Sequence, residues 1–273
     1  MTRRPSLRLS SVAVGVLAVV WFYPLAWTFA NAVRSSADIY RAPWDVPWPP
    51  AIENLGEAWD RAQLGVALLN TVYVTGLTVA IVLLTSVAGA YALTRLQPPG
   101  RALLFLLVLA PLIIPTEVLV VPTFGLFRSL GMINSLSGLA VYNAVGNIAV
   151  ATVILAGAFR TIPQELVDAA RLDGAGRLDV LVRIVVPLAR PAIIAVAVIV
   201  AVFTWNDFGG ALILIQRPDA FTAQLALTTF STFYATDQGL TFAGMAIVIL
   251  PPLLLFLVLQ RSFIQGLTPG AVR

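Results

Sequence analysis

The sequence contains no cysteine, no histidine and no lysine. Without cysteine and histidine, the chain can form no disulfide, no thiolate nucleophile, no His-containing catalytic triad and no His/Cys metal site. A Walker A phosphate-binding loop requires a lysine, so the chain carries none. If the protein uses ATP in that way, another subunit must bind the nucleotide.

Charged residues are also scarce. They make up 11% of the 273 residues, whereas hydrophobic residues make up 59%, and the mean hydropathy is +0.91. Apolar residues account for roughly half of an ordinary soluble domain, so this composition indicates a membrane protein. The pI near 10 does not indicate nucleic-acid binding, because the arginines do not cluster with aromatic residues on a soluble face.

Charges bracket six long, nearly uncharged runs, each long enough to cross about 30 Å of hydrocarbon. We therefore predict an all-α integral membrane protein with one transmembrane domain over residues 1–273. The predicted spans are residues 9–33, 66–94, 102–124, 138–159, 190–214 and 239–260.

The first run could be a secretory signal, because Arg3, Arg4 and Arg8 precede it and Ala30-Asn31-Ala32 has the form of a cleavage site. Its apolar core is about twice the usual 7–15 residues, which favours a retained anchor helix. An N-terminus inside the cell puts twelve arginines on the cytoplasmic side and five outside. This asymmetry predicts that both termini are cytoplasmic.

The densest polar segment, "ELVDAARLDGAGRLDVLVRIVVPLARP" (Glu165 to Pro191), lies between the fourth and fifth runs. Leu166, Ala169 and Ala170 predict one face of a short helix from Gln164 to Asp173, which Gly174 and Gly176 end. Leu178, Leu181, Val182 and Val185 predict one face of a second helix that ends at Pro187, with Asp179 and Arg183 paired at i, i+4. Helices this short need a surface to pack on. Periodicity alone leaves two alternatives, an idle surface and a docking site for a soluble partner.

In this segment "DAARLDG" is followed by nine residues and then "IVVP". The spacing resembles the EAA loop of ABC-transporter permeases, with Asp168 in place of the usual glutamate and Val186 in place of leucine. The segments "LLNTVYVTGLTVAIVLLTSVAGAYALTRLQPPGR", "VPTFGLFRSLGMINS", "TWND" and "LQRSFIQGLTPGAVR" extend the resemblance over nearly the whole chain. They are similar to the second permease of maltose-type or glycerol-3-phosphate-type importers.

The resemblance implies a cytoplasmic coupling loop over residues 161–187, between the fourth and fifth transmembrane helices. It also implies three kinds of partner besides membrane lipid: a second permease, two ATPase subunits that bind ATP and magnesium, and an extracytoplasmic sugar-binding protein. No cofactor and no catalytic residue is expected in this chain, which would lie in the inner or plasma membrane. The residues implied to couple to the ATPase are Glu165, Asp168, Ala169, Ala170, Asp173, Gly174, Ile184 and Pro187.

Polar residues inside the apolar runs are candidates for a substrate path, because a mid-membrane carboxylate is costly and must face protein or water. The alternative is that they form hydrogen bonds between helices or mark a bend. A non-ABC transporter or channel remains an alternative function, and an intramembrane hydrolase with paired carboxylates is a weaker one. The candidate path residues are Glu117, Asn143, Asn147, Trp205, Asn206 and Asp207.

Overall fold

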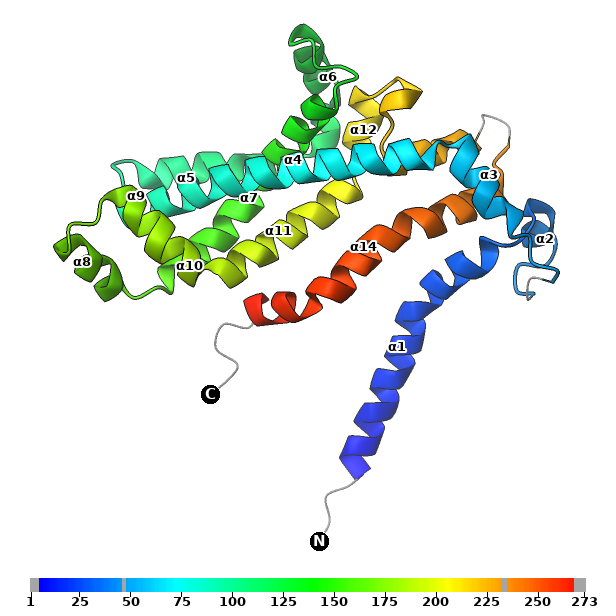
Figure 1. The fold of residues 1–273 in the computed structure, drawn as a ribbon, viewed down its shortest axis with the longest axis horizontal. Coiled ribbons are helices and arrows are strands. Elements are labelled where there is room, and N and C mark those ends of the chain that lie inside the picture. The colour runs from blue at the N-terminus through cyan, green and yellow to red at the C-terminus, as the bar shows by residue number, and fades with distance from the viewer. Residues whose placement is uncertain (1–4, 46–47, 232–234, 268–273) are drawn as a thin grey trace. The chain divides into compact units, whose positions relative to one another are not determined.

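A computed structural model describes residues 5–45, 48–231 and 235–267 (Figure 1). Within these ranges the regular structure is helical, and the one β-type pairing is an isolated bridge between Ser231 and Thr236. The chain divides into two compact units, residues 1–67 with 226–251 and residues 68–225 with 252–273. The prediction of an all-α protein is confirmed.

The first unit is tied together by polar contacts to the segment that follows helix α1. Arg34 is 5% exposed, and its guanidinium donates hydrogen bonds to the carbonyls of Asp38, Ala42 and Pro43, which satisfies the C-terminal end of a short helix. The Nδ2 of Asn54 donates to the Arg34 carbonyl over 2.8 Å. The helices of this unit are α1 (Pro5–Asn31), α2 (Ser36–Arg41), α3 (Glu53–Arg61), the 3₁₀ turn η6 (Leu227–Phe230) and the first part of α14 (Gln238–Leu267).

The second unit is built around two long helices, α4 (Leu64–Tyr91) and α7 (Leu136–Arg160), with α11 (Arg190–Trp205) packed on α7. Small residues line the buried face of α7, which lets neighbouring backbones approach closely. Its other elements are η1 (Ala92–Leu96), α5 (Arg101–Leu109), η2 (Ala110–Leu112), η3 (Thr116–Leu119), α6 (Val120–Ser129), α8 (Gln164–Leu172), α9 (Arg177–Val180), η4 (Leu181–Val185), α10 (Val186–Leu188), α12 (Gly209–Leu214), η5 (Pro218–Ala220) and α13 (Ala223–Ala226).

Among the described residues, four helices are long and apolar enough to cross a membrane. They are Ser11–Asn31, Leu64–Leu96, Leu136–Arg160 and Gln238–Leu255. A fifth is obtained if Arg177–Leu188 and Arg190–Trp205, which are bent by 78° at their junction, count as one span. The structure thus has four to five candidate spans, and four of the predicted runs correspond directly to long helices.

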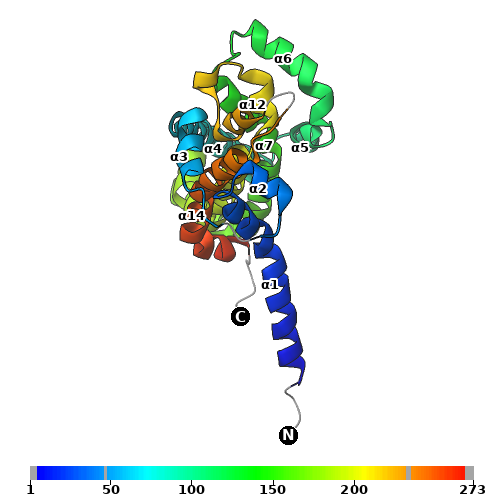
Figure 2. The same ribbon diagram turned by 90° about the vertical axis from the view of Figure 1, so that its right-hand side faces the viewer.

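The third predicted run, residues 102–124, does not form one straight helix. Figures 1 and 2 show that the chain turns between α5 and α6, and the segment between them contains the short helices η2 and η3. Pro111 and Pro115 lie in this segment. A proline lacks the N–H of the helical ladder and disfavours helix in the residue before it, which accounts for the breaks.

The fifth predicted run, residues 190–214, is also interrupted. Helix α11 ends at Trp205, and α12 begins at Gly209. The break falls at Asn206 and Asp207, the polar residues of this run.

Candidate functional site

The polar segment between α7 and α11 forms two short helices joined by a tight turn. Helix α8 ends at Leu172, and Gly174 follows its C-cap with a φ of +88°. The Gly174 N–H bonds to the Arg171 carbonyl over 3.0 Å, and the Ala175 N–H bonds to the Ala170 carbonyl over 2.9 Å. These two bonds are those of a Schellman motif, in which glycine supplies the left-handed residue. Asp173, the residue before Gly174, is the C-cap of α8.

The second short helix is continuous from Arg177 through Pro187 and ends at Leu188, one residue beyond the predicted end. The five residues Leu181–Val185, which include Ile184, form a π turn, and α10 follows without a gap. The ring of a helical proline crowds the carbonyl four residues earlier and removes one hydrogen bond. A π turn directly before Pro187 changes the bonding where that conflict arises. We call residues 164–188 the two-helix element.

Two side chains of the α4–η1 helix hold the two-helix element in place. Arg95 donates from Nη1 to Oε1 of Gln164 over 2.7 Å and from Nη2 to the carbonyls of Phe159 and Ile162. Tyr91 is 4% exposed, and its hydroxyl donates to the Arg177 carbonyl over 2.9 Å. Arg95 therefore anchors the start of α8, and Tyr91 anchors the start of α9. Sequence reasoning did not predict either role, because the partners lie 64 to 86 positions later in the chain.

The face that the two-helix element buries differs from the predicted one. Val167 in α8 and Val180 and Val185 in the second helix are fully buried, and of these only Val185 was predicted for an apolar face. The predicted residues Leu166 and Ala169 are exposed. Leu178 and Val182, also predicted for the packed face, are exposed as well. Ala170, Leu181 and Ile184 are half-buried.

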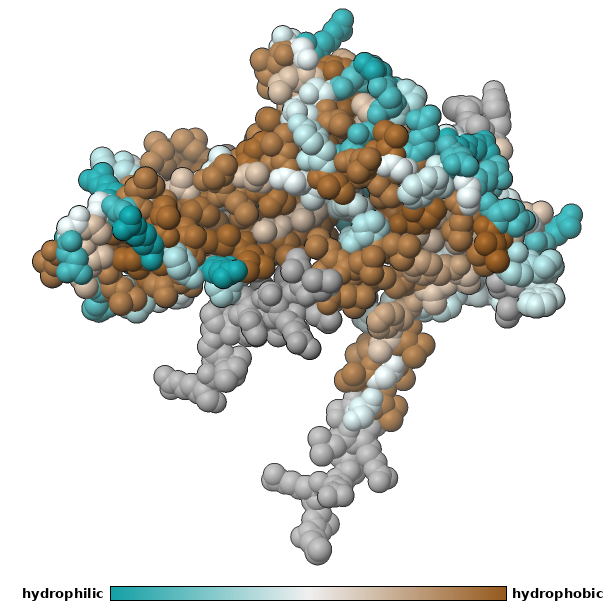
Figure 3. Space-filling model, viewed as in Figure 1, coloured by the Kyte–Doolittle hydropathy of each residue, from teal (hydrophilic) through white to brown (hydrophobic). Residues whose placement is uncertain are grey.

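The exposed side of this element is partly apolar. Leu172 is 89% exposed and Leu178 is 71% exposed, on either side of the Gly174 turn. In Figure 3 hydrophilic and apolar residues adjoin on the surface of α8 and α9. This mixed surface is available to a partner.

The acidic residues of the two-helix element lie on its surface. Asp168 accepts a hydrogen bond from Nε2 of Gln164 over 3.0 Å and lies 3.8 Å from Nη1 of Arg171. Glu165 lies exposed in the first turn of α8, and Pro187 is exposed in α10. The predicted pair of Asp179 and Arg183 is confirmed, with 3.4 Å between Oδ1 and Nε.

A second cluster of predicted residues surrounds Asp207 at the α11–α12 break. Asn143 of α7 is 8% exposed and donates from Nδ2 to Oδ2 of Asp207 over 3.0 Å. The other carboxylate oxygen of Asp207 accepts the Gly210 N–H over 3.0 Å, which caps the start of α12. The structure thus joins Asn143 to Asp207, and this pair both links two helices and stabilises the bend.

The remaining residues of the predicted path are placed less closely together. Asn147 donates to the Asn143 carbonyl over 2.8 Å, and Trp205 is 8% exposed. Asn206 is exposed, and its Oδ1 accepts from Nε2 of Gln224 over 3.3 Å. Glu117 belongs to η3, and its side chain lies outside the part of the chain that the structure describes.

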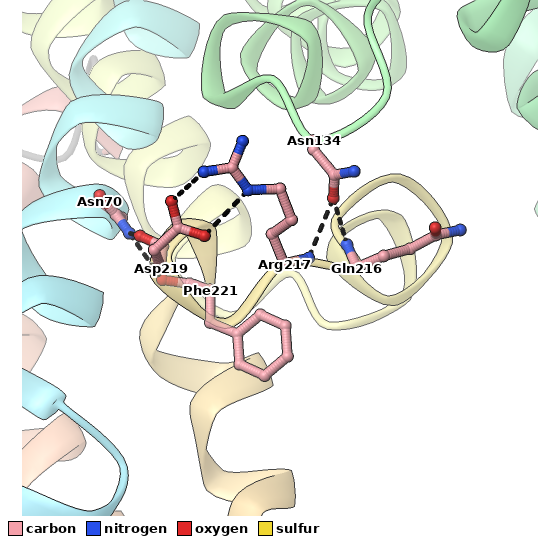
Figure 4. A network of polar contacts seen from close by, with 6 residues as sticks. All are labelled: Asn70, Asn134, Gln216, Arg217, Asp219 and Phe221. Carbon is pink, nitrogen blue, oxygen red and sulfur yellow. Dashed lines mark hydrogen bonds and ion pairs between the residues drawn. The ribbon is translucent and has the colours of Figure 1, made fainter.

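A third network, absent from the sequence-based prediction, fixes the loop after α12 (Figure 4). The Oδ1 of Asn134 accepts the N–H groups of Gln216 over 2.6 Å and Arg217 over 3.0 Å, and Nδ2 of Asn70 donates to the carbonyls of Asp219 and Phe221. Arg217 pairs with Asp219 through two hydrogen bonds, of 3.0 Å and 2.5 Å. This hydrogen bonding lowers the pKa of the Asp219 carboxyl and raises the pKa of Arg217.

Residues 81–269 match the family described as "Binding-protein-dependent transport system inner membrane component". The chain belongs to this family. It is therefore a multi-pass inner-membrane permease subunit and not an enzyme.

The relatives cover essentially the full length of this permease. It is 32% identical over 272 residues to the melibiose/raffinose/stachyose import permease protein MelC of Bacillus subtilis, which is 99% of this chain and 98% of that protein. It is 30% identical over 269 residues to the trehalose transport system permease protein SugB of Mycobacterium tuberculosis, which is 97% of this chain and 96% of the relative. A solved bacterial ABC transporter involved in the import of the acidic polysaccharide alginate has the same fold, with a TM-score of 0.81 at 21% identity, over 96% of this chain and 99% of that one.

Proposed function

We propose that this permease is one of two membrane subunits of an ATP-binding-cassette importer for sugars. Its six spans would comprise the four long helices, the bent pair that includes α11, and the broken segment between Arg101 and Ser129. The arginine asymmetry supports cytoplasmic termini. ATP and magnesium would bind to two partner ATPase subunits, since this chain has no Walker A lysine.

The sugar class is supported by the names of the full-length relatives. MelC is named for melibiose, raffinose and stachyose, and SugB for trehalose. The hydrogen-bonded pair of Asn143 and Asp207 would lie along the transport path, where an amide and a carboxylate can bind hydroxyl groups. Asn147, Trp205, Asn206 and Glu117 complete the proposed path, with Asn206 the most accessible of the described members.

The observation that carries the proposal is the two-helix element itself. Arg95 and Tyr91 hold its inner side, and its outer side presents Leu172, Leu178 and the carboxylate of Asp168. An element anchored in this way can transmit a push from a soluble partner to α4 and α7 as a rigid body. Docking of an ATPase on residues 164–188 would then couple nucleotide-driven closure to alternating access.

Each residue of the proposed coupling surface would contribute either a contact to the ATPase or the shape of the element. Glu165, Asp168 and Asp173 would supply polar contacts to the ATPase, and Ala169 and Ala170 would allow its close approach. Gly174 makes the turn between the helices, and Ile184 and Pro187 belong to the second helix that leads into α11.

Co-purification tests this function. The full-length chain should co-purify with an ATPase subunit and a second membrane subunit. Reconstitution of this complex with the binding protein should give ATP-dependent sugar uptake. Leu172→Asp should weaken ATPase association by about tenfold or more, since burial of a leucine contributes about 1.5–3 kcal/mol. Leu130→Asp, at an exposed leucine after α6, is the matched control and should leave association unchanged. An active transporter formed by this chain alone would instead favour a non-ABC transporter or channel.

Asp168 provides a separate test of coupling. Its side chain is exposed and contacts only Gln164 and Arg171 of its own helix among the described residues. Asp168→Ala should therefore leave the chain folded while uptake per ATP hydrolysed falls. Full uptake by this variant would contradict the assigned role of Asp168.

A further inference from the structure

A pocket of about 450 Å³ lies beside the end of the α4–η1 helix. Residues from three segments line it: Leu93 and Gln97 near the π turn, Arg101, Ala102 and Phe105 of α5, and Arg160 at the end of α7. All of these belong to the second compact unit. Neither the coupling surface nor the proposed sugar path includes this pocket.

The described part of the chain offers neither arginine of the pocket a counter-ion. Among the residues that the structure describes, the Arg101 and Arg160 guanidinium groups form no ion pair and no hydrogen bond, and both side chains are exposed. Several other arginines of this chain do have protein partners. Arg34 and Arg95 bind carbonyls, and Arg217 binds a carboxylate. The pocket therefore contains two uncompensated positive charges and no acidic lining residue.

The position of the pocket along the helices places it at the membrane surface. The candidate spans Leu64–Leu96 and Leu136–Arg160 end beside it, and the apolar helix Arg101–Leu112 begins there. The first turn of α5 follows Gly100 without a side-chain cap, so its N–H groups also favour a negative ligand. The positive charge that would attract an anion thus lies where the apolar helices end at the water boundary.

The other wall of the pocket is apolar. Leu93, Ala102 and Phe105 line it, and along α5 the exposed side chains Leu103 and Leu106 continue away from the arginines. A ligand that matches this arrangement has an anionic head and hydrocarbon chains. Pockets of basic residues between transmembrane helices at the membrane surface have this preference.

We propose that this pocket binds the phosphate headgroup of an anionic phospholipid, with Arg101 and Arg160 as its ligands and the α5 leucines against its acyl chains. Gln97 can donate a further hydrogen bond to the headgroup. The bound lipid joins the ends of α4, α5 and α7 next to the Arg95 contacts that anchor the two-helix element. This assignment does not depend on which solute is transported.

The test uses the full-length chain purified in a neutral detergent, with thermal unfolding as the measurement. Phosphatidylglycerol, phosphatidylcholine and inorganic phosphate are titrated separately. Phosphatidylglycerol should raise the unfolding temperature in a saturable way, and the other two should not. Arg101→Gln with Arg160→Gln should weaken the apparent affinity for phosphatidylglycerol by about 30-fold, at about a fivefold loss per arginine near an anionic surface.

Two further variants separate the pocket from the rest of the surface. Arg128→Gln removes an exposed arginine of α6 and should leave the titration unchanged. Ala102→Trp starts from an exposed position and fills the pocket without changing its charge, so it should also abolish the effect even if the double arginine variant fails to fold. Equal stabilisation by inorganic phosphate would overturn the lipid assignment in favour of a free-anion site. An unchanged phosphatidylglycerol effect in Ala102→Trp would overturn the pocket itself.

Discussion

Replacement of Gly174 by alanine tests whether the turn of the two-helix element is needed for coupling. Gly174 has a φ of +88°, and a Cβ built there would meet no atom within 4 Å. Its substitution therefore introduces backbone strain without a steric clash. A left-handed conformation costs an ordinary L-residue about 1–2 kcal/mol.

That cost must appear in one of two measurable quantities. If the turn keeps its shape, the unfolding temperature of the chain falls. If the turn relaxes, the Schellman bonds of Gly174 and Ala175 break, α8 and α9 change their angle, and ATPase association weakens by about 5- to 30-fold. Thermal unfolding in detergent and a binding titration with the ATPase subunit, done on the same preparation, measure both.

Two matched variants sharpen the result. Gly157→Ala lies within α7, where an added Cβ also meets no atom within 4 Å and φ is not positive. It should be neutral or slightly stabilising, because alanine is the better helix former. Gly174→Asn should be milder than Gly174→Ala, since asparagine tolerates the left-handed region. The reasoning is refuted if Gly174→Ala matches Gly157→Ala in both measurements.

Three more substitutions follow from contacts in the structure. Gly210→Ala should lower the free energy of unfolding by about 1–3 kcal/mol in thermal unfolding, because its Cβ would lie 2.3 Å from a Tyr142 ring carbon. The adjacent Gly209→Ala should not lower it, because a Cβ there would meet no atom within 4 Å. For Asn134, which has a φ of +58° and accepts two backbone N–H groups, alanine should destabilise more than glycine, because alanine loses the bonds and also strains the backbone. An equal effect of the two would refute this account. Arg95→Gln should reduce ATPase association several-fold without affecting membrane insertion, measured by co-purification and by yield in the membrane fraction.

Much of the fold was predictable because membrane spans depend on local composition. Long apolar runs between arginines predicted the helices α1, α4, α7 and α14, and the spacing of small and polar residues predicted a helix, a glycine turn and a second helix between α7 and α11. The third run was not predictable in the same way. Its mean hydropathy says nothing about how prolines such as Pro111 and Pro115 divide it.

The buried face of the two-helix element was mispredicted for a specific geometric reason. An α-helical period applied to Leu178–Val185 groups residues that are three and four positions apart. The structure buries Val180 and Val185, which are five apart, because the π turn Leu181–Val185 contains one more residue than an α turn. In the shorter helix α8 only Val167 is fully buried. The prediction for α8 was based on Leu166, Ala169 and Ala170, and three residues were too few to identify its buried face.

The path residues illustrate a different limit. Asn143 and Asp207 are 64 positions apart, and nothing in either local sequence indicated that they meet. The hydrogen bond between them and the α12 cap give this pair a structural role, and its place on the transport path belongs to the proposed function. Arg95 and Tyr91 were likewise undetectable, because all but one of their partners are backbone carbonyls, which any sequence has.

The π turn at Ala92–Leu96 has a consequence for insertions and deletions. Arg95 lies inside it, and successive residues of an α-helix are rotated by about 100°. Loss of one residue from this turn would restore a regular α-helix and change the direction of the Arg95 side chain, moving the guanidinium away from the α7–α8 junction. A homologous chain one residue shorter at this point would keep its apolar span, its hydropathy profile and its loop spacing. It would nevertheless lose the link between span and loop, unless an arginine stood one position away.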